Sequence, residues 1–313
     1  MALLDPPQIL PNVAAVLLRT VRGMDGQEAT RDDLEKIVAP AALQRGERAS
    51  AGPGSRGFED TLTACVAIGL FERVDDVVRL HPALPEAVRD RRREPDAPRL
   101  LRELILTEQL NLNPWESNVG ARDLTRALAW YLAQDPLRPP AGWNEPDGVD
   151  LVQERQFTAS EQVFSNDTRW GAFRRWAAFL GFVVGVPRGS RTVLIPDPTA
   201  AIRDVAPPLL GSERIEVNSF VEELARKLPV LDGGEYRRAV EARMRPDTVT
   251  ASSDQLSPSL AHALLRLRDE QVLVIEDLAD APMKMQLPRP FGPEQTVTHV
   301  SLATEGRKAR LTR

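Results

Sequence analysis

Cysteine and histidine, the side chains most often found as transition-metal ligands or nucleophiles, are nearly absent from this sequence of 313 residues. It contains one cysteine, Cys65, and three histidines, His81, His262 and His299, which stand far apart along the chain. One cysteine excludes an internal disulfide, and isolated histidines do not indicate a metal site. Cys65 falls on the apolar face of an expected helix, where a thiol packs in the core and is unreactive.

Long apolar runs are also missing. No uncharged apolar run approaches about 18 residues, so the sequence predicts no membrane span. No secretory or transit signal stands before Pro6 and Pro7, and we expect a cytoplasmic protein. Aromatic residues make up only 5% of the chain, but hydrophobic residues at 42% and charged residues at 27% are values typical of globular proteins. A chain of this length is expected to form about two or three domains.

Motifs that carry chemistry are equally scarce. Residues 52–57 (GPGSRG) match the dinucleotide-binding fingerprint formally, but no strand precedes them, so the match has no structural context. The chain has no phosphate-binding loop and no nucleophile elbow, and no spacing selects a pair of carboxylates for acid–base work. We therefore expect no enzyme, with no catalytic residue, cofactor, metal or small-molecule substrate.

The net charge of the chain is −5, with a pI near 5.5. A protein that coats nucleic acid without regard to sequence takes most of its affinity from neutralising phosphates, and an acidic chain does not fit that class. A local basic surface on an acidic protein is still compatible with this composition.

One pattern occurs three times: an amphipathic helix, a short hydrophobic segment, a turn and a second hydrophobic segment. The copies span residues 57–84, 168–199 and 256–287. A helix followed by a two-stranded wing is the second half of a winged-helix domain. The predicted fold class is therefore mainly α with small β-hairpins (α+β), built as tandem winged-helix domains joined by helical segments.

Capping residues support these elements. We expect Thr30 to cap a short helix, Gly69 to end the helix of the first copy, and Ser257 with Pro258 to begin the helix of the third. The Pro-rich residues 136–146 indicate a boundary. The predicted segments are winged-helix domain 1 over residues 1–95, a helical connector with a Pro-rich linker over 96–145, basic winged-helix domain 2 over 146–210, a helical segment over 211–250, and winged-helix-like domain 3 with a basic tail over 251–313.

The charges of the wings differ from copy to copy. The first wing carries Asp75 and Asp76, and the third carries Glu276, Asp277 and Asp280. These carboxylates would be repelled by DNA phosphates. The two outer copies are therefore expected to contact partner proteins.

The middle copy is basic. Its apolar positions Trp170, Phe173, Ala177 and Leu180 recur at helical spacing and are expected to face inward. Arginine suits both phosphate contact and bidentate guanine recognition. The predicted DNA-binding residues are the arginines of this copy, which has no acid between Thr168 and Ile195: Arg169, Arg174, Arg175, Arg188 and Arg191.

An alternative is that these arginines solvate a helix and pair with acids of a neighbouring domain. Trp176, on the same surface, is expected to pack in the core in preference to stacking on bases. Two further basic groups, residues 89–93 and the tail 307–313, are typical of a solvated helix end and of a nonspecific contact, respectively.

Tandem winged helices with acidic wings resemble, in architecture, the kleisin-binding partners of bacterial condensins. Residues 123–136 (DLTRALAWYLAQDP) and 166–182 (NDTRWGAFRRWAAFLGF) are similar to a more particular family, DpdG, an accessory protein of the bacterial islands that insert deazapurine bases into DNA. The resemblance covers about residues 100–200. It implies a role in DNA modification or phage defence beside larger ATPases, nucleases and base-exchange enzymes, and it brings no catalytic motif.

We therefore predict a non-catalytic DNA-binding and scaffolding component of a bacterial DNA-modification or antiviral defence system. Its partners would be double-stranded DNA and proteins of a larger complex. Two alternatives stay open. One is a pure protein–protein adaptor, and the other is a transcriptional regulator, which three dissimilar copies disfavour because a regulator typically presents one reader per subunit of a symmetric dimer.

Overall fold

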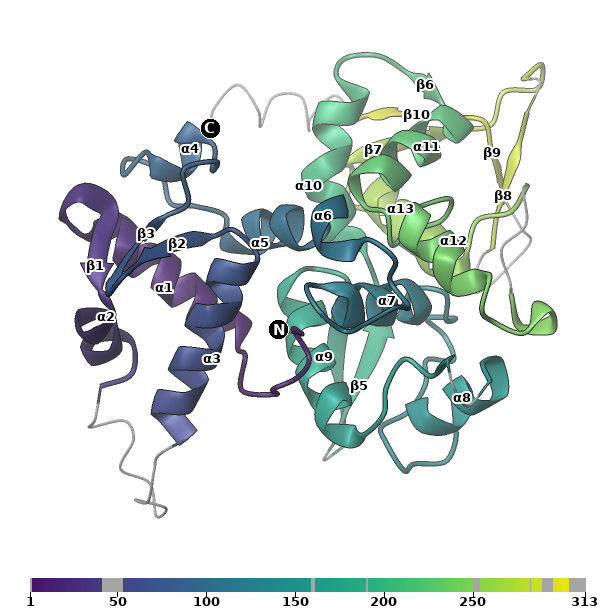
Figure 1. Ribbon diagram of the computed structural model, residues 1–313. Helices are drawn as coiled ribbons and strands as arrows, with labels where there is room; N and C mark the ends of the chain where they lie inside the picture. The colour runs from purple at the N-terminus through teal and green to yellow at the C-terminus, as the bar shows by residue number, and fades with distance from the viewer. Residues whose placement is uncertain are drawn as a thin grey trace. The chain divides into compact units, whose positions relative to one another are not determined.

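The computed structural model describes residues 2–40, 53–158, 161–189, 191–249, 254–281, 283–288 and 295–303, and it is mainly helical with small antiparallel sheets (Figure 1). This confirms the predicted class of mainly α with small β-hairpins. The contacts gather into unit 1, Met1–Thr125 with Asn166–Leu180, and unit 2, Arg126–Ser165 with Gly181–Arg313. This grouping is coarser than the five segments expected from the sequence, and that division stays a prediction.

Unit 1 begins with three helices and a small sheet. Its elements run in the order α1 (Pro11–Gly23), β1 (Glu28–Thr30), α2 (Arg31–Val38), α3 (Pro53–Ala67), β2 (Phe71–Val74) and β3 (Val77–Leu80). The strand order is β1-β3-β2, and both pairs are antiparallel. Four further helices follow: α4 (Glu86–Arg89), α5 (Ala97–Ile105), α6 (Glu108–Asn111) and the start of α7 (Arg122–Tyr131). The helix α9 (Asp167–Phe179) completes the unit.

Local chemistry explains the bounds of these elements. The side chain of Thr30 accepts a hydrogen bond from the Asp33 amide at 3.2 Å, so it caps α2 as expected. Phe58, Leu62 and Cys65 lie on the buried face of α3. The chain leaves α3 through Gly69 at φ +77°, a left-handed conformation that favours glycine and turns the chain into β2.

Unit 2 contains α8 (Val149–Gln156) and a separate two-stranded hairpin, β4 (Val183–Arg188) with β5 (Arg191–Pro196). It continues with α10 (Thr199–Leu210), β6 (Ile215–Glu216), α11 (Val217–Lys227), α12 (Glu235–Glu241) and α13 (Pro258–Asp269). It ends with β7 (Leu273–Glu276), β8 (Met285–Leu287), β9 (Gln295–Val297) and β10 (His299–Leu302). Ser257 accepts a hydrogen bond from the Leu260 amide and Pro258 is the first residue of α13, both as expected.

The strand pairing in the C-terminal part of unit 2 differs from the pairing expected for the third copy of the sequence pattern. The sequence pattern pairs residues 273–276 with the hydrophobic segment up to Leu287, but β7 pairs with β10, and β8 pairs with β9. The resulting strand order, β6-β10-β7, repeats that of unit 1, since in both sheets the last strand lies between the other two. The element order also repeats: a helix, a short strand, further helices, then the remaining strands.

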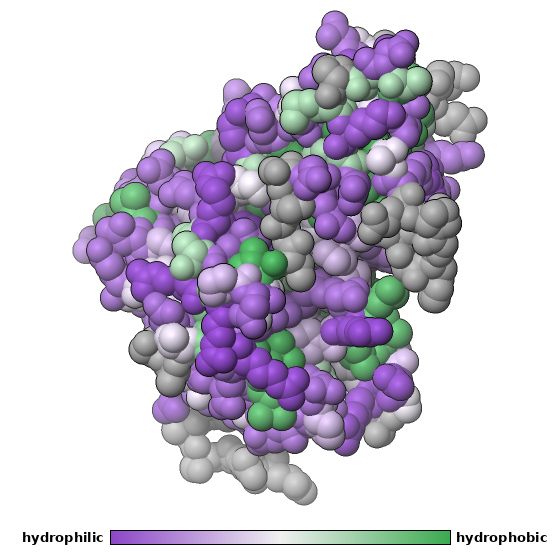
Figure 2. Space-filling view, turned by 90° about the vertical axis from the view of Figure 1, so that its right-hand side faces the viewer, coloured by the Kyte–Doolittle hydropathy of each residue, from purple (hydrophilic) through white to green (hydrophobic). Residues whose placement is uncertain are grey.

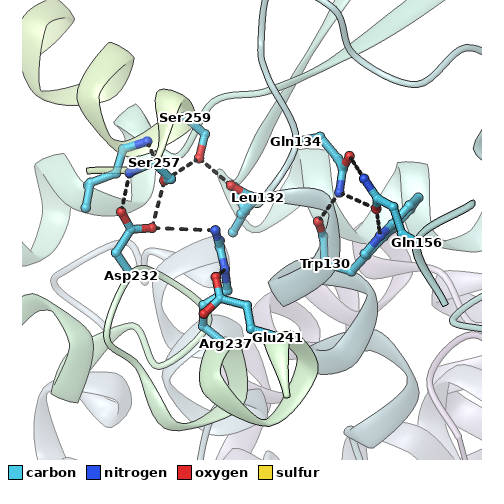
Figure 3. A network of polar contacts seen from close by, with 10 residues as sticks. Trp130, Leu132, Gln134, Gln156, Asp232, Arg237, Glu241, Ser257 and Ser259 are labelled. Atoms are coloured by element: carbon cyan, nitrogen blue, oxygen red, sulfur yellow. Dashed lines mark hydrogen bonds and ion pairs between the residues drawn. The ribbon is translucent and has the colours of Figure 1, made fainter. Parts of the chain in front are cut away.

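Buried polar groups connect the elements of unit 2 (Figure 3). The Asp232 carboxylate accepts hydrogen bonds from the amide and hydroxyl of Ser257 at 2.6 and 2.7 Å, which fixes the N-terminus of α13. Ser259 donates to the carbonyl oxygen of Leu132, just after α7. The first turn of α13 is thereby held to two other parts of the unit.

Candidate nucleic-acid interface

The helix α9, which carries three of the five predicted DNA-binding arginines, forms as expected. The Asn166 side chain accepts a hydrogen bond from the Arg169 amide at 2.9 Å and caps the helix. Trp170 and Phe173 are buried and stacked, with ring centroids 5.5 Å apart. Trp176 is also buried, and its indole N–H donates to the Ile9 carbonyl oxygen at 3.2 Å, so it packs in the core of unit 1.

Two of the three arginines of α9 have partners in the N-terminal residues 3–9. The Arg169 guanidinium lies 2.7 Å from the Asp5 carboxylate, and Arg175 donates to the Pro7 carbonyl oxygen at 2.7 Å. Burial, and then repulsion from Arg174, lowers the pKa of the Arg175 guanidinium, so this group has lost part of its hydration. The surface of α9 is less open to DNA than its sequence alone indicates.

The N-terminal segment is itself anchored. The amides of Leu3 and Leu4 donate to the two oxygens of the Asp123 carboxylate at 3.1 and 2.7 Å. Leu3, Leu4 and Ile9 are buried, and Asp123 is only 1% exposed. Residues 3–9 therefore follow a defined path along α9, next to the N label in Figure 1.

The other two predicted arginines stand at the end of the β4–β5 hairpin, which belongs to unit 2. Arg188 and Arg191 face each other in the register of the two strands, and Gly189 between them has φ +62°. Both arginines are exposed, and Arg191 lies 2.6 Å from the Glu145 carboxylate. The contact grouping thus assigns Arg169, Arg174 and Arg175 to unit 1 and the hairpin arginines to unit 2.

The hairpin is otherwise uncharged. Its strands contain valine, glycine, proline, threonine, leucine and isoleucine, with no acid from Val183 to Pro196. Val184 and Val186 of β4 are 40% and 44% exposed, which is unusual for valine and leaves one strand face in contact with solvent. The face of the molecule drawn in Figure 2 is mostly hydrophilic, and its hydrophobic residues form small separate groups.

The acidic residues of the two outer copies lie at a hairpin turn in unit 1 and in and after β7 in unit 2, where the predicted two-stranded wing does not form. Asp75 and Asp76 occupy the turn between β2 and β3 and are exposed. In unit 2, hydrogen bonds from Thr296 and then Lys284 lower the pKa of Asp277. Carboxylates at these places disfavour contact with phosphates.

The basic residues 89–93 are held by a buried guanidinium. Arg22 is 5% exposed and donates to the carbonyl oxygens of Val88, Asp90 and Arg93 at 2.5, 2.6 and 2.7 Å. Arg89 donates to the His81 carbonyl oxygen at 2.5 Å. The loop is therefore a structural connection between α4 and α5 with exposed arginines, and the predicted tail 307–313 lies outside the described residues.

Possible metal ligands do not gather in the part of the chain that the structure describes. It contains no group of three His, Cys, Asp or Glu side chains that would hold a metal ion. Burial raises the pKa of the Cys65 thiol far above its ordinary value, so the thiolate that a nucleophile requires is not formed. Among the described helices none is long and apolar enough to cross a bilayer.

Comparison with known proteins supports the resemblance seen in the sequence. A family model described as DpdG-like matches residues 1–281. The chain belongs to the DpdG-like family. Neither the curated proteins nor the solved structures contain a match to it. Membership in the DpdG-like family supports a role as an accessory component of a DNA-modification system that has several proteins.

Proposed function

We propose that this DpdG-like protein is a non-catalytic component that binds double-stranded DNA through the tip of the β4–β5 hairpin and holds partner proteins through its acidic surfaces. Two exposed arginines on a hairpin free of acids support this proposal. Hairpins in winged-helix proteins reach the DNA backbone or the minor groove, and arginine is the preferred side chain in a narrow minor groove. Arg191 also pairs with Glu145, but both groups are partly exposed, and an exposed pair costs only about 0–1 kcal/mol to break.

We further propose that the first three helices and sheet of unit 1, and the segment from α10 to β10 of unit 2, are winged-helix modules. The repeated element order and the repeated strand order β1-β3-β2 and β6-β10-β7 support this. In each module the negative charge of the wing disfavours DNA and favours a basic protein surface. The arginines of α9 would add to DNA binding when they are accessible.

The test is equilibrium binding to a fluorescent DNA duplex over a series of salt concentrations. Each phosphate contact contributes about −0.9 to the slope of log affinity against log salt. We expect Arg188→Ala with Arg191→Ala to make that slope less steep by about 1.8 and to weaken binding at low salt. A matched control is Arg73→Ala with Arg79→Ala, which removes two arginines from the acidic β2–β3 wing; it should leave both affinity and slope unchanged.

Two results would overturn the DNA proposal. One is a wild-type protein that does not bind duplex DNA even at low salt. The other is an equal loss of binding in the hairpin variant and in the control variant, which would indicate a general charge effect. The adaptor function would then be favoured, because the exposed carboxylates Asp75 and Asp76 stay available to a basic partner protein.

A further inference from the structure

We propose that residues 3–9 are an autoinhibitory segment whose Asp5 carboxylate occupies Arg169 in the place that a DNA phosphate would take. This inference rests on the proposed DNA-binding function and concerns the regulation of α9. The occupant is therefore this chain's own N-terminal segment, and the competitor is the phosphodiester backbone of duplex DNA.

The first observation is chemical likeness. A carboxylate and a phosphate both accept hydrogen bonds from the guanidinium fork of arginine. The Asp5 carboxylate lies 2.7 Å from the Arg169 guanidinium, and the Pro7 carbonyl oxygen lies at the same distance from that of Arg175. Two acceptor oxygens of one segment thus bind two arginines of one helix, as successive phosphates of a DNA strand would.

The second observation is how the segment is attached. Its two ends are buried: Leu3 and Leu4 donate to Asp123, and the Ile9 carbonyl oxygen accepts from Trp176. The Asp5 side chain between them is 53% exposed, and that of Arg169 is 20% exposed. The segment is therefore firmly anchored at both ends, but the ion pair in its middle is open to solvent and to competition.

The ion pair between Asp5 and Arg169 is weak enough for a phosphate to compete with it. Because more than half of the Asp5 side chain is exposed, the ion pair contributes little to stability, so a phosphate can displace the carboxylate without unfolding the anchors. The cation that the segment covers is also partly desolvated, since burial lowers the pKa of Arg175. DNA that displaces residues 5–7 would gain contacts with arginines that are already held in place by α9.

The experiment compares Asp5→Asn with the matched control Asp167→Asn in the duplex-binding assay. Both variants lose one negative charge near the start of α9, but only Asp5 pairs with Arg169. We expect Asp5→Asn to bind DNA up to about five-fold more tightly at low salt and to make the negative salt slope steeper by about 0.9, because Arg169 gains a phosphate. Asp167→Asn should change the slope little.

A double variant identifies the residue that is released. Asp5→Asn combined with Arg169→Ala should return the salt slope to the wild-type value. Hydrogen exchange gives a readout independent of affinity: adding duplex DNA to the wild-type protein should speed exchange in a peptide that covers residues 3–10.

The failures are distinguishable. If wild-type protein binds DNA with a salt-dependent affinity but Asp5→Asn behaves as wild type or as Asp167→Asn, the autoinhibitory segment is refuted and the hairpin proposal stands. If wild type does not bind at all, and Asp5→Asn does not bind either, both proposals fall. If only Asp5→Asn binds, autoinhibition is supported in its strongest form.

Discussion

Arg237 offers the sharpest test of how unit 2 is held together. Its side chain is only 1% exposed; the guanidinium Nε donates to Glu241 at 2.5 Å, and Nη2 lies 3.8 Å from Asp232 (Figure 3). Neither Nη1 nor Nη2 has a hydrogen-bond partner among the described residues. The positive charge is thus balanced by two carboxylates, but its hydrogen-bonding capacity is only partly used.

Removing one partner of a buried ion pair costs about 3–5 kcal/mol, because the remaining charge is left uncompensated. We expect Arg237→Met to lower the free energy of unfolding by about 3 kcal/mol, at the lower end of this range. The reason is that Asp232 keeps both hydrogen bonds from Ser257, and the Glu241 side chain is 19% exposed. Adding Glu241→Gln should recover part of the loss, since it removes the charge that Arg237→Met leaves unpaired.

Urea unfolding followed by circular dichroism measures both effects. With a slope of about 3 kcal/mol per molar urea, the single variant should lower the midpoint by about 1 M. Arg238→Met, an exposed position on the same helix, is the control and should change stability by less than about 0.5 kcal/mol. The reasoning is refuted if Arg237→Met matches the control, or if the double variant is less stable than the single one.

Three further outcomes are expected. Cys65 should not react with a thiol reagent until the protein unfolds, because the thiol is buried and its pKa is raised; rapid modification of native protein would contradict this. Thr30→Ala should cost about 1 kcal/mol in urea unfolding, since it leaves the Asp33 amide without its cap, whereas Thr30→Ser should cost much less. The hydrogen bond from Arg243 lowers the pKa of Glu161 below its ordinary value of 4.5. A lowered carboxyl pKa stabilises the fold above that ordinary value, and the stabilisation is lost as pH falls through the lowered pKa. The difference in unfolding midpoint between wild type and Glu161→Gln should therefore shrink from pH 6 towards pH 3, and an increase would contradict this reasoning.

The elements that could be predicted are those whose residues interact locally. Capping by Thr30 and Ser257 needs only the next three residues, and the turn at Gly69 needs only a residue without a side chain. The buried face of α9 also follows from spacing alone, because the period of the helix places Trp170, Phe173 and Ala177 on one side. These features can be predicted from a single sequence because they depend only on residues that are near one another in the chain.

The pairing of the strands could not be predicted from the sequence in this way. β7 pairs with β10 across an intervening hairpin, while the segment 285–287 has equally suitable apolar residues and stands nearer in the sequence. The first strands of the two sheets, β1 and β6, are only 3 and 2 residues long, too short to leave an alternating pattern. The repeated strand order could therefore be seen only in the folded chain.

The charge pairing at the predicted interface also depends on residues that are distant in the sequence. From Thr168 to Ile195 the chain contains five arginines and no acid, yet Arg169 meets Asp5 from 164 residues away and Arg191 meets Glu145 from 46 residues away. The net charge of a segment shows how far its cations outnumber its acids. Whether a phosphate can reach those cations depends on acids from elsewhere in the chain that the fold places beside them. The two pairs differ in how they are held, because Asp5 belongs to a segment anchored at both ends, whereas the Arg191 side chain is 66% exposed at a hairpin tip. If the proposed DNA binding occurs, a phosphate at the hairpin would have to displace one exposed carboxylate, whereas on α9 it would also have to move residues 5–7. The proposal therefore predicts that the hairpin makes the first contact and that α9 is the regulated surface.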